Sequence, residues 1–389
     1  MGVLLLKQAN RVLSTYAADV SGVCSALYEL GGMTVMHDAS GCNSTYSTHD
    51  EPRWYDTDSL VFLSALTEVN AVMGADDKLI ADVTETALSL RPKFIALAGS
   101  PIPMITGVDL PGVARVIEEK TGIPAFGFNT NGMHSYLPGV SRALAAVAER
   151  FCGPCERDAA PSVNILGATP LDLSVTGTAE ALRGAFEARG IRVNSCWAMG
   201  SSLDELAGAA RARVNAVVSS SGLAAAGVLR RRFGTPYVVG LPFGAAFSDA
   251  YFGALREAAA SGENRSPART DAGEGGAPIF LIGEAVYMTS LRAALRAMGR
   301  KNVRVLCPLE CSDGLLSPDD LAVSAEEDIR EALRDARLVI ADPMYAPVLP
   351  GAAELIALPH EAYSGRIYRR QIPVLVGSAL DEWIEEKRK

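Results

Sequence analysis

Continuously apolar runs alternate with amphipathic stretches along this chain, and the alternation predicts its elements. The run PKFIALAG at residues 92–99 predicts a buried strand, because it is short, apolar and bounded by proline and glycine. Residues 76–90 carry apolar side chains at helical spacing, so they predict an amphipathic helix that ends before Pro92. A helix at 111–121 and a strand at 123–128 follow. This order of strand, helix and strand indicates a parallel sheet with helices on its faces.

The same pattern starts again twice, in a chain too long for one ordinary core. SVNILGAT at 162–169 begins a second cycle and PIFLIG at 278–283 begins a third, with a polar, glycine-rich linker at 261–276 between them. We therefore predict an α/β fold of three Rossmann-like domains, whose parallel sheets are flanked by helices. The predicted domains are residues 1–155, 156–276 and 277–389. In such sheets ligands bind at the carboxyl ends of the strands, where the loops gather.

Composition and charge restrict the partners. A formal net charge of −9 without a basic stripe argues against a nucleic-acid partner. The apolar start MGVLLLKQANRVL is too short for a membrane span and lacks a preceding basic region, and no other uninterrupted run reaches spanning length. We therefore expect a soluble, cytoplasmic protein that has no membrane partner.

The cysteines suggest metal binding. An odd number of cysteines without a secretion signal disfavours a disulfide framework and leaves thiols for ligation or catalysis. They are Cys24, Cys42, Cys152, Cys155, Cys196, Cys307 and Cys311. Cys24 ends a helical pattern and Cys42 lies in a glycine-flanked turn; the alternative is two small buried side chains. Cys152 and Cys155 have the spacing of a thioredoxin-type pair, but they follow a helix, which favours a linker role.

The turn around Cys42 resembles a known family. HDASGCNSTY at 37–46, followed by HDEPRW at 49–54, is similar to the turn that carries a cluster cysteine in component 1 of nitrogenase. It equally resembles the nitrogenase-like reductases that act on chlorophyll and F430 precursors. The resemblance covers nearly the whole chain and implies three Rossmann-like domains per subunit. It also implies three cysteines per subunit that hold a cluster at the subunit interface.

Two of those three cysteines have a match in this chain. Cys24 and Cys42 fit the first two, and Ser100 stands where the resemblance places the third. Two thiolates cannot complete a [4Fe–4S] cluster, which needs four protein ligands. A two-fold homodimer supplies four thiolates, whereas a Ser100 alkoxide is a harder, less suitable ligand for iron. We therefore expect one [4Fe–4S] cluster shared across a homodimer.

The resemblance also implies a second site, between the domains. The cysteine that holds the catalytic cofactor of nitrogenase falls at Ser219-Ser220-Ser221, so that ligand is absent, and the iron–molybdenum cofactor is not expected. HEAYSGRIY matches the family's histidine segment through His360. Cys307 and Cys311 lie in the loop CPLEC, with Glu310 between them. With His360, these cysteines are candidate ligands of a second metal centre; chance spacing of packed cysteines is the alternative. Glu310 and His360 are the candidate catalytic residues.

The absence of a G-x-x-x-x-G-K-[ST] loop argues against ATP hydrolysis by this chain. The resemblance implies a separate ATP-dependent iron–sulfur reductase as electron donor. We predict the catalytic component of a nitrogenase-like reductase, an oxidoreductase with a small-molecule or tetrapyrrole substrate. The alternatives are a non-catalytic scaffold or carrier for metal-cofactor assembly and, in particular, a tetrapyrrole reductase.

The other histidines have less defined roles. We expect His37 to hold the Cys42 turn through hydrogen bonds. We place His49, in a polar loop with Arg53, at the surface or near the dimer contact. His134, in NTNGMHSY, has no role implied by the family, although its loop is a candidate border of the cluster or the cavity.

Overall fold

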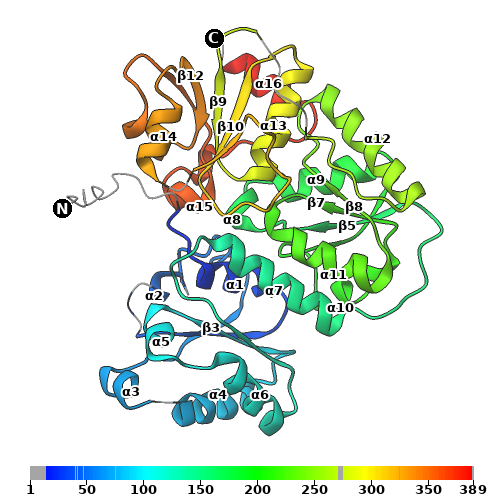
Figure 1. Cartoon of the computed structure of the whole chain (residues 1–389). Helices are drawn as coiled ribbons and strands as arrows, with labels where there is room; N and C mark the ends of the chain where they lie inside the picture. Colours follow the sequence, from blue (N-terminus) through cyan, green and yellow to red (C-terminus); the bar gives the residue numbers. More distant parts are fainter. Residues whose placement is uncertain are drawn as a thin grey trace.

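The computed structural model describes residues 15–387, apart from residues 40, 42, 47, 75, 270–274 and 324 (Figure 1). It contains three sheets, and every pairing between their named strands is parallel. The predicted α/β class is therefore confirmed. Each sheet falls within one of the three predicted domain ranges, whose boundaries at 155 and 276 stay predictions.

The N-terminal domain has the strand order β2-β1-β3-β4. Its elements are α1 (Asp19–Leu27), β1 (Met33–His37), α2 (Asn43–Tyr46), β2 (Leu60–Leu63), α3 (Glu68–Met73), α4 (Asp76–Leu90), β3 (Ile95–Gly99), α5 (Pro101–Thr106), α6 (Leu110–Thr121), β4 (Ala125–Phe128) and α7 (Tyr136–Phe151). Alternate residues of a strand face opposite sides. Met33 and Val35 accordingly join the core under α4 and α6, whereas Met36 joins the core under α1 and α7. We expected helix over most of residues 1–30, and the helix in the described part is α1.

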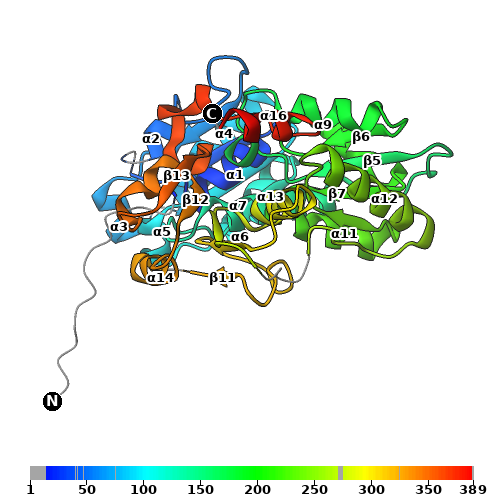
Figure 2. The ribbon, with the colours of Figure 1, turned by 90° about the horizontal axis from the view of Figure 1, so that it is seen from above.

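The middle domain has the strand order β6-β5-β7-β8. Its elements are β5 (Ser162–Leu166), α8 (Pro170–Leu173), α9 (Thr178–Glu187), β6 (Arg192–Cys196), α10 (Leu203–Ala207), η1 (Ala209–Arg211), β7 (Val214–Val217), η2 (Ser220–Gly222), α11 (Leu223–Phe233), β8 (Tyr237–Val239) and α12 (Ala245–Ser261). Figure 2 shows α9 and α11 on opposite sides of this sheet, in agreement with their separate cores.

The C-terminal domain has the strand order β11-β10-β9-β12-β13. Its elements are β9 (Ile279–Ile282), α13 (Ala285–Ala297), β10 (Val303–Cys307), β11 (Leu321–Ala322), α14 (Glu326–Ala332), β12 (Leu338–Ala341), η3 (Pro343–Val348), β13 (Glu354–Ala357), α15 (Glu361–Ser364), η4 (Gly365–Ile367), η5 (Arg369–Gln371) and α16 (Ala379–Glu386). Among the described residues, no helix is both long and apolar enough to cross a membrane.

Helices α1 and α7 cross in backbone contact at the centre of the molecule. A Cβ atom added at Gly22 would overlap the carbonyl of Tyr136, and one added at Gly139 would overlap the carbonyl of Asp19. Only glycine permits this approach. Helix α7 also packs on α11, and α8 contacts both α1 and α15. The three domains therefore meet around α1, the helix that carries Cys24 (Figure 1).

Candidate functional site

A hollow of about 470 Å³ lies at the carboxyl edge of the N-terminal sheet. Three segments singled out from the sequence line it. Val20 and Ser21 belong to the helix of Cys24, Gly41 and Asn43 flank position 42, and Pro101 follows Ser100. Cys42 itself lies outside the described residues. The parallel strands cause this convergence, because β1 and β3 end at the same edge.

Cys24 lies one helical turn beyond the lining residues of α1 and is fully buried. Burial raises the pKa of its thiol, and the carboxylate of Glu51 raises it further. Tyr46 of α2, the helix that follows position 42, interacts with both Cys24 and Ser25. Without a metal the thiol therefore stays protonated, and iron would have to displace that proton.

Ser100 supplies a polar atom without a partner. Its hydroxyl is fully buried and has no hydrogen-bond partner among the described residues. Ser100 is the N-cap residue of α5, yet its side chain makes no capping bond. A buried hydroxyl left unpaired costs about 1–3 kcal/mol. The residues around position 42 thus fit a bound group that would contact this hydroxyl.

His37 and Ser64 hold the start of the turn. The Nδ1 atom of His37 lies 2.8 Å from Ser64 Oγ, which also accepts the backbone N–H of Asp38 at 3.1 Å. Burial lowers the pKa of His37. The hydrogen-bonding role expected for His37 agrees with these contacts.

Arg53 supports the helix of Cys24, a role that sequence reasoning missed. The Arg53 guanidinium is buried and donates to Glu51 at 2.7 Å and to Glu29 at 2.8 Å. It also donates to the carbonyl of Ser25 at 2.8 Å and to that of Ala198 at 2.6 Å. Arg53 therefore joins α1 to the middle domain. The signal was an arginine two residues from a glutamate in an otherwise surface-like loop.

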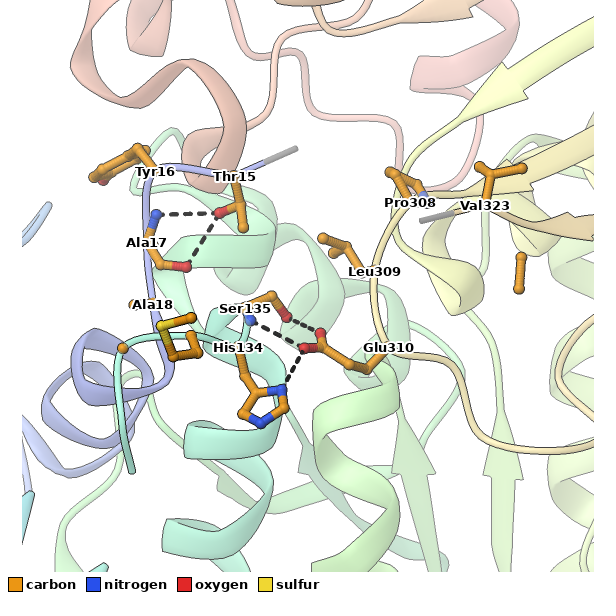
Figure 3. A pocket seen from close by; sticks show the side chains of 13 residues that line it. Thr15, Tyr16, Ala17, Ala18, His134, Ser135, Pro308, Leu309, Glu310 and Val323 are labelled. Carbon is orange, nitrogen blue, oxygen red and sulfur yellow. Dashed lines mark hydrogen bonds and ion pairs between the residues drawn. The ribbon is translucent and has the colours of Figure 1, made fainter. Parts of the chain in front are cut away.

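A second cavity, of about 650 Å³, lies between the N-terminal and C-terminal domains (Figure 3). Residues 15–18 and 132–135 line one side, and residues 308–310 with Ala322 and Val323 line the other. Tyr16, Ala18 and Gly132 line both this cavity and the hollow beside position 42. The two spaces are therefore neighbours.

Glu310 lies in this cavity and connects the two domains. Its carboxylate accepts the backbone N–H of Ser135 at 3.1 Å and the Ser135 hydroxyl (Figure 3). Burial opposes ionisation, but the hydrogen bonds from Ser135 outweigh it, and with His134 they hold the pKa of Glu310 below its usual value. Glu310 therefore carries a fixed negative charge at neutral pH.

The thiols of Cys307 and Cys311 interact with each other at the ends of the same loop. Cys307 is buried and Cys311 is half-buried. The interaction between the thiols lowers the pKa of Cys311, and it raises the pKa of Cys307 together with burial. His360 does not join them. Among the described residues, no group of three or more His, Cys, Asp or Glu side chains is arranged to hold a metal ion.

His360 is buried where α15 begins. Its Nδ1 atom accepts the backbone N–H of Ala362 at 3.3 Å, which assigns the ring proton to Nε2. Nε2 has no hydrogen-bond partner among the described residues and lies 3.8 Å from Asp172 Oδ1. Burial lowers the pKa of His360 to about 3. The imidazole is therefore neutral and caps a helix.

Aromatic and acidic side chains fill the space around His360. The ring centroid of Tyr363 lies 4.7 Å from that of His360, and Tyr136 donates to Asp172. Burial, and then the charge of Glu284, raises the pKa of Asp172 to about 7. All of these side chains are buried. We call these five residues (Tyr136, Asp172, Glu284, His360 and Tyr363) the buried centre.

A family model described as nitrogenase component 1 type oxidoreductase matches residues 22–308. The chain belongs to this family. The match begins within α1 and ends just after Cys307, so it includes the turn of Cys42. The resemblance inferred from that turn is confirmed.

Several curated relatives share part of the chain. The nitrogenase iron-molybdenum cofactor biosynthesis protein NifE of Clostridium pasteurianum is 26% identical over 179 residues, which are 46% of this chain and 38% of that protein. The NifE protein of Rhizobium meliloti is 29% identical over 42% of this chain and 34% of its own length. The nitrogenase molybdenum-iron protein beta chain of Bradyrhizobium diazoefficiens is 24% identical over 40% of this chain and 32% of its own length. The matched region thus spans well under half of each relative.

The structure is similar to a solved family member over its whole length. It matches the structure titled "Nitrogenase Cp1 at pH 6.5" with a TM-score of 0.70 and 13% identity, over 100% of this chain and 94% of the other. This similarity confirms the fold.

Proposed function

We propose that this nitrogenase component 1 type chain is the catalytic component of a nitrogenase-like reductase. It takes electrons from an ATP-dependent iron–sulfur reductase through a [4Fe–4S] cluster at a homodimer interface, in the cytoplasm. The electrons pass to a substrate or second metal centre in the cavity between the domains. The observation that carries this proposal is the convergence of α1, the flanks of position 42 and the start of α5 around one hollow.

Cys24 and Cys42 would hold the cluster, and the same two residues of a second copy would complete the four ligands. A cluster bound there would accept and release single electrons. The unpaired hydroxyl of Ser100 supports a contact with a sulfide, or a weaker ligand role. The side chains of Arg53 and Tyr46 would keep α1 and α2 in place around it.

The neighbouring cavity of about 650 Å³ is the proposed substrate site, since such volumes suit small-molecule ligands. Glu310, a catalytic candidate from the sequence, lies there and would contribute to the reaction. For Cys307 and Cys311 we keep the proposal of a second metal centre as a dithiol site. His360 would join it only if the ring left its capping bond to Ala362.

The first test removes the proposed ligands. In protein purified without oxygen, we expect Cys24→Ala and Cys42→Ala each to lose most bound iron and sulfide and the electron paramagnetic resonance signal of the reduced cluster. Cys196→Ala is the matched control, because Cys196 is equally buried but belongs to the middle sheet. Iron content unchanged in both variants would contradict the proposal.

The relatives' names favour a second candidate function. Five of the curated relatives that match this chain are named nitrogenase iron-molybdenum cofactor biosynthesis protein NifE. A scaffold or carrier of this kind would transfer a metal cofactor to an acceptor protein without turnover. A reductase would instead consume reductant in proportion to a reduced product, from either a small molecule or a tetrapyrrole.

A further inference from the structure

His134 lines the cavity of about 650 Å³ and has one nitrogen engaged. Its Nδ1 atom lies 3.3 Å from Glu310 Oε1, and no described residue bonds its Nε2 atom. The side chain is 47% exposed, so water reaches it from the open side of the cavity. Figure 3 shows Glu310 extending from the C-terminal domain to both His134 and Ser135.

The backbone of His134 is fixed from α1. The Asp19 carboxylate accepts the N–H of Asn131 at 3.0 Å and that of Gly132 at 2.8 Å, and the N–H of Asp19 donates to the carbonyl of His134 at 3.1 Å. The helix that carries Cys24 therefore also positions His134.

Glu310 determines which nitrogen of the His134 ring is left to face a bound molecule. Two bonds from Ser135 hold the carboxylate, and its charge attracts a proton on the nearer ring nitrogen, Nδ1. The nitrogen that remains for a bound molecule is then Nε2. The other titratable groups around this loop are Asp19 and Tyr16, and burial raises the pKa of Tyr16, so its phenol stays neutral.

The other histidines are less suited to proton transfer here. His37 and His360 are buried, and burial lowers the pKa of both. His49 lies beside Asp50, with Nε2 3.7 Å from Oδ1, and does not line this cavity. Of the four histidines of the chain, only His134 lines the cavity.

We propose that His134 is the proton donor for reduction of an unsaturated molecule bound in this cavity, and that Glu310 is its positioning residue. This inference rests on the proposed function. The N–H bond at Nε2 of the doubly protonated ring breaks, and that proton bonds to one atom of a C=C, C≡C or C=N group. Two electrons arrive singly from the partner reductase, the second proton comes from water, and no group leaves. Water then protonates His134 again.

The test uses the iron-loaded, full-length protein, a low-potential europium(II) reductant, and two probes: acetylene as a small unsaturated molecule and protochlorophyllide as a tetrapyrrole. We expect His134→Gln to lower kcat by about 100-fold or more, with KM within a few-fold, because positioned general acids contribute about 10²–10⁴-fold. Imidazole added to His134→Gly should restore part of the rate. Arg334→Gln, at an exposed residue that does not line this cavity, is the control and should keep the rate of the unmodified protein.

Imidazole rescue separates proton transfer from a structural role, because added imidazole replaces a missing acid but not a missing structural contact. Glu310→Gln should also lower kcat with KM within a few-fold, because the ring loses the carboxylate that orients it. Equal rates in His134→Gln and the unmodified protein overturn the proposal, as does failure to reduce either probe while the cluster is present and reducible. Absence of the cluster overturns the proposed function instead.

Discussion

Two regions of this protein contain residues that match the family's ligands. They differ in whether the polar atoms of those residues already have hydrogen-bond partners. Beside position 42, Ser100 has an unpaired hydroxyl, and Cys24 is buried one helical turn beyond the residues of α1 that line an open hollow. In the buried centre, His360 already caps a helix and Asp172 already accepts a bond from Tyr136.

The difference lies in packing and not in residue type. Histidine and cysteine are both good metal ligands. At the turn, the sheet edge leaves space between three segments, whereas in the buried centre the rings of Tyr287 and Tyr363 pack against one imidazole. A matching residue therefore indicates a ligand only where its lone pair is not committed elsewhere.

The largest expected effect concerns Arg53, which supports α1 in the region beside position 42. Arg53→Met should lower the free energy of unfolding by about 3–5 kcal/mol, because it leaves Glu51 as an unpaired buried charge. Urea titration with circular dichroism measures this. Arg231→Met, which breaks an exposed pair with Glu149, should cost less than about 1 kcal/mol. Similar losses in the two variants would show that Arg53 does not hold α1.

The next effect concerns the buried centre and depends on pH. Because the folded-state pKa of Asp172 is raised to about 7, the folded protein binds more protons than the unfolded chain between about pH 4 and 7. Ionisation of Asp172 thus removes stability as pH rises through this range. Asn mimics the protonated acid and can still accept from Tyr136.

Asp172→Asn should therefore become more stable relative to the unmodified protein by roughly 1–3 kcal/mol between pH 5 and pH 7.5, and the difference should level off above that. Chemical denaturation across the pH series gives the result. Parallel stability curves would mean that Asp172 is already ionised in the folded protein.

The smallest expected effect separates the two regions directly. His360→Asn keeps an N-cap acceptor for α15, so it should cost about 1 kcal/mol of stability. It should leave the iron content unchanged, in contrast to Cys24→Ala. Loss of iron in His360→Asn, measured per folded protein, would show that the buried centre also holds metal.

Much of the fold could be predicted from local patterns. The strand at 92–99 and the helix at 76–90 appear as β3 (Ile95–Gly99) and α4 (Asp76–Leu90), because apolar periodicity records which face each element buries. The sequence of the turn around Cys42 was sufficient to identify the family. The role of Arg53 was not predicted, because a charged residue in a polar loop gives no local sign of carboxylates brought to it by folding.

The amino-acid sequence by itself determines the parallel α/β units and the sheet edge at which their loops gather. Both follow from local periodicity and connection rules. Which donors are left unpaired depends on contacts between residues distant in the chain. Glu310 meets His134 and Ser135 only when two domains dock, and His360 loses a lone pair to Ala362 only when α15 forms beside Asp172. Burial and hydrogen bonding therefore decide which candidate side chains remain available for chemistry.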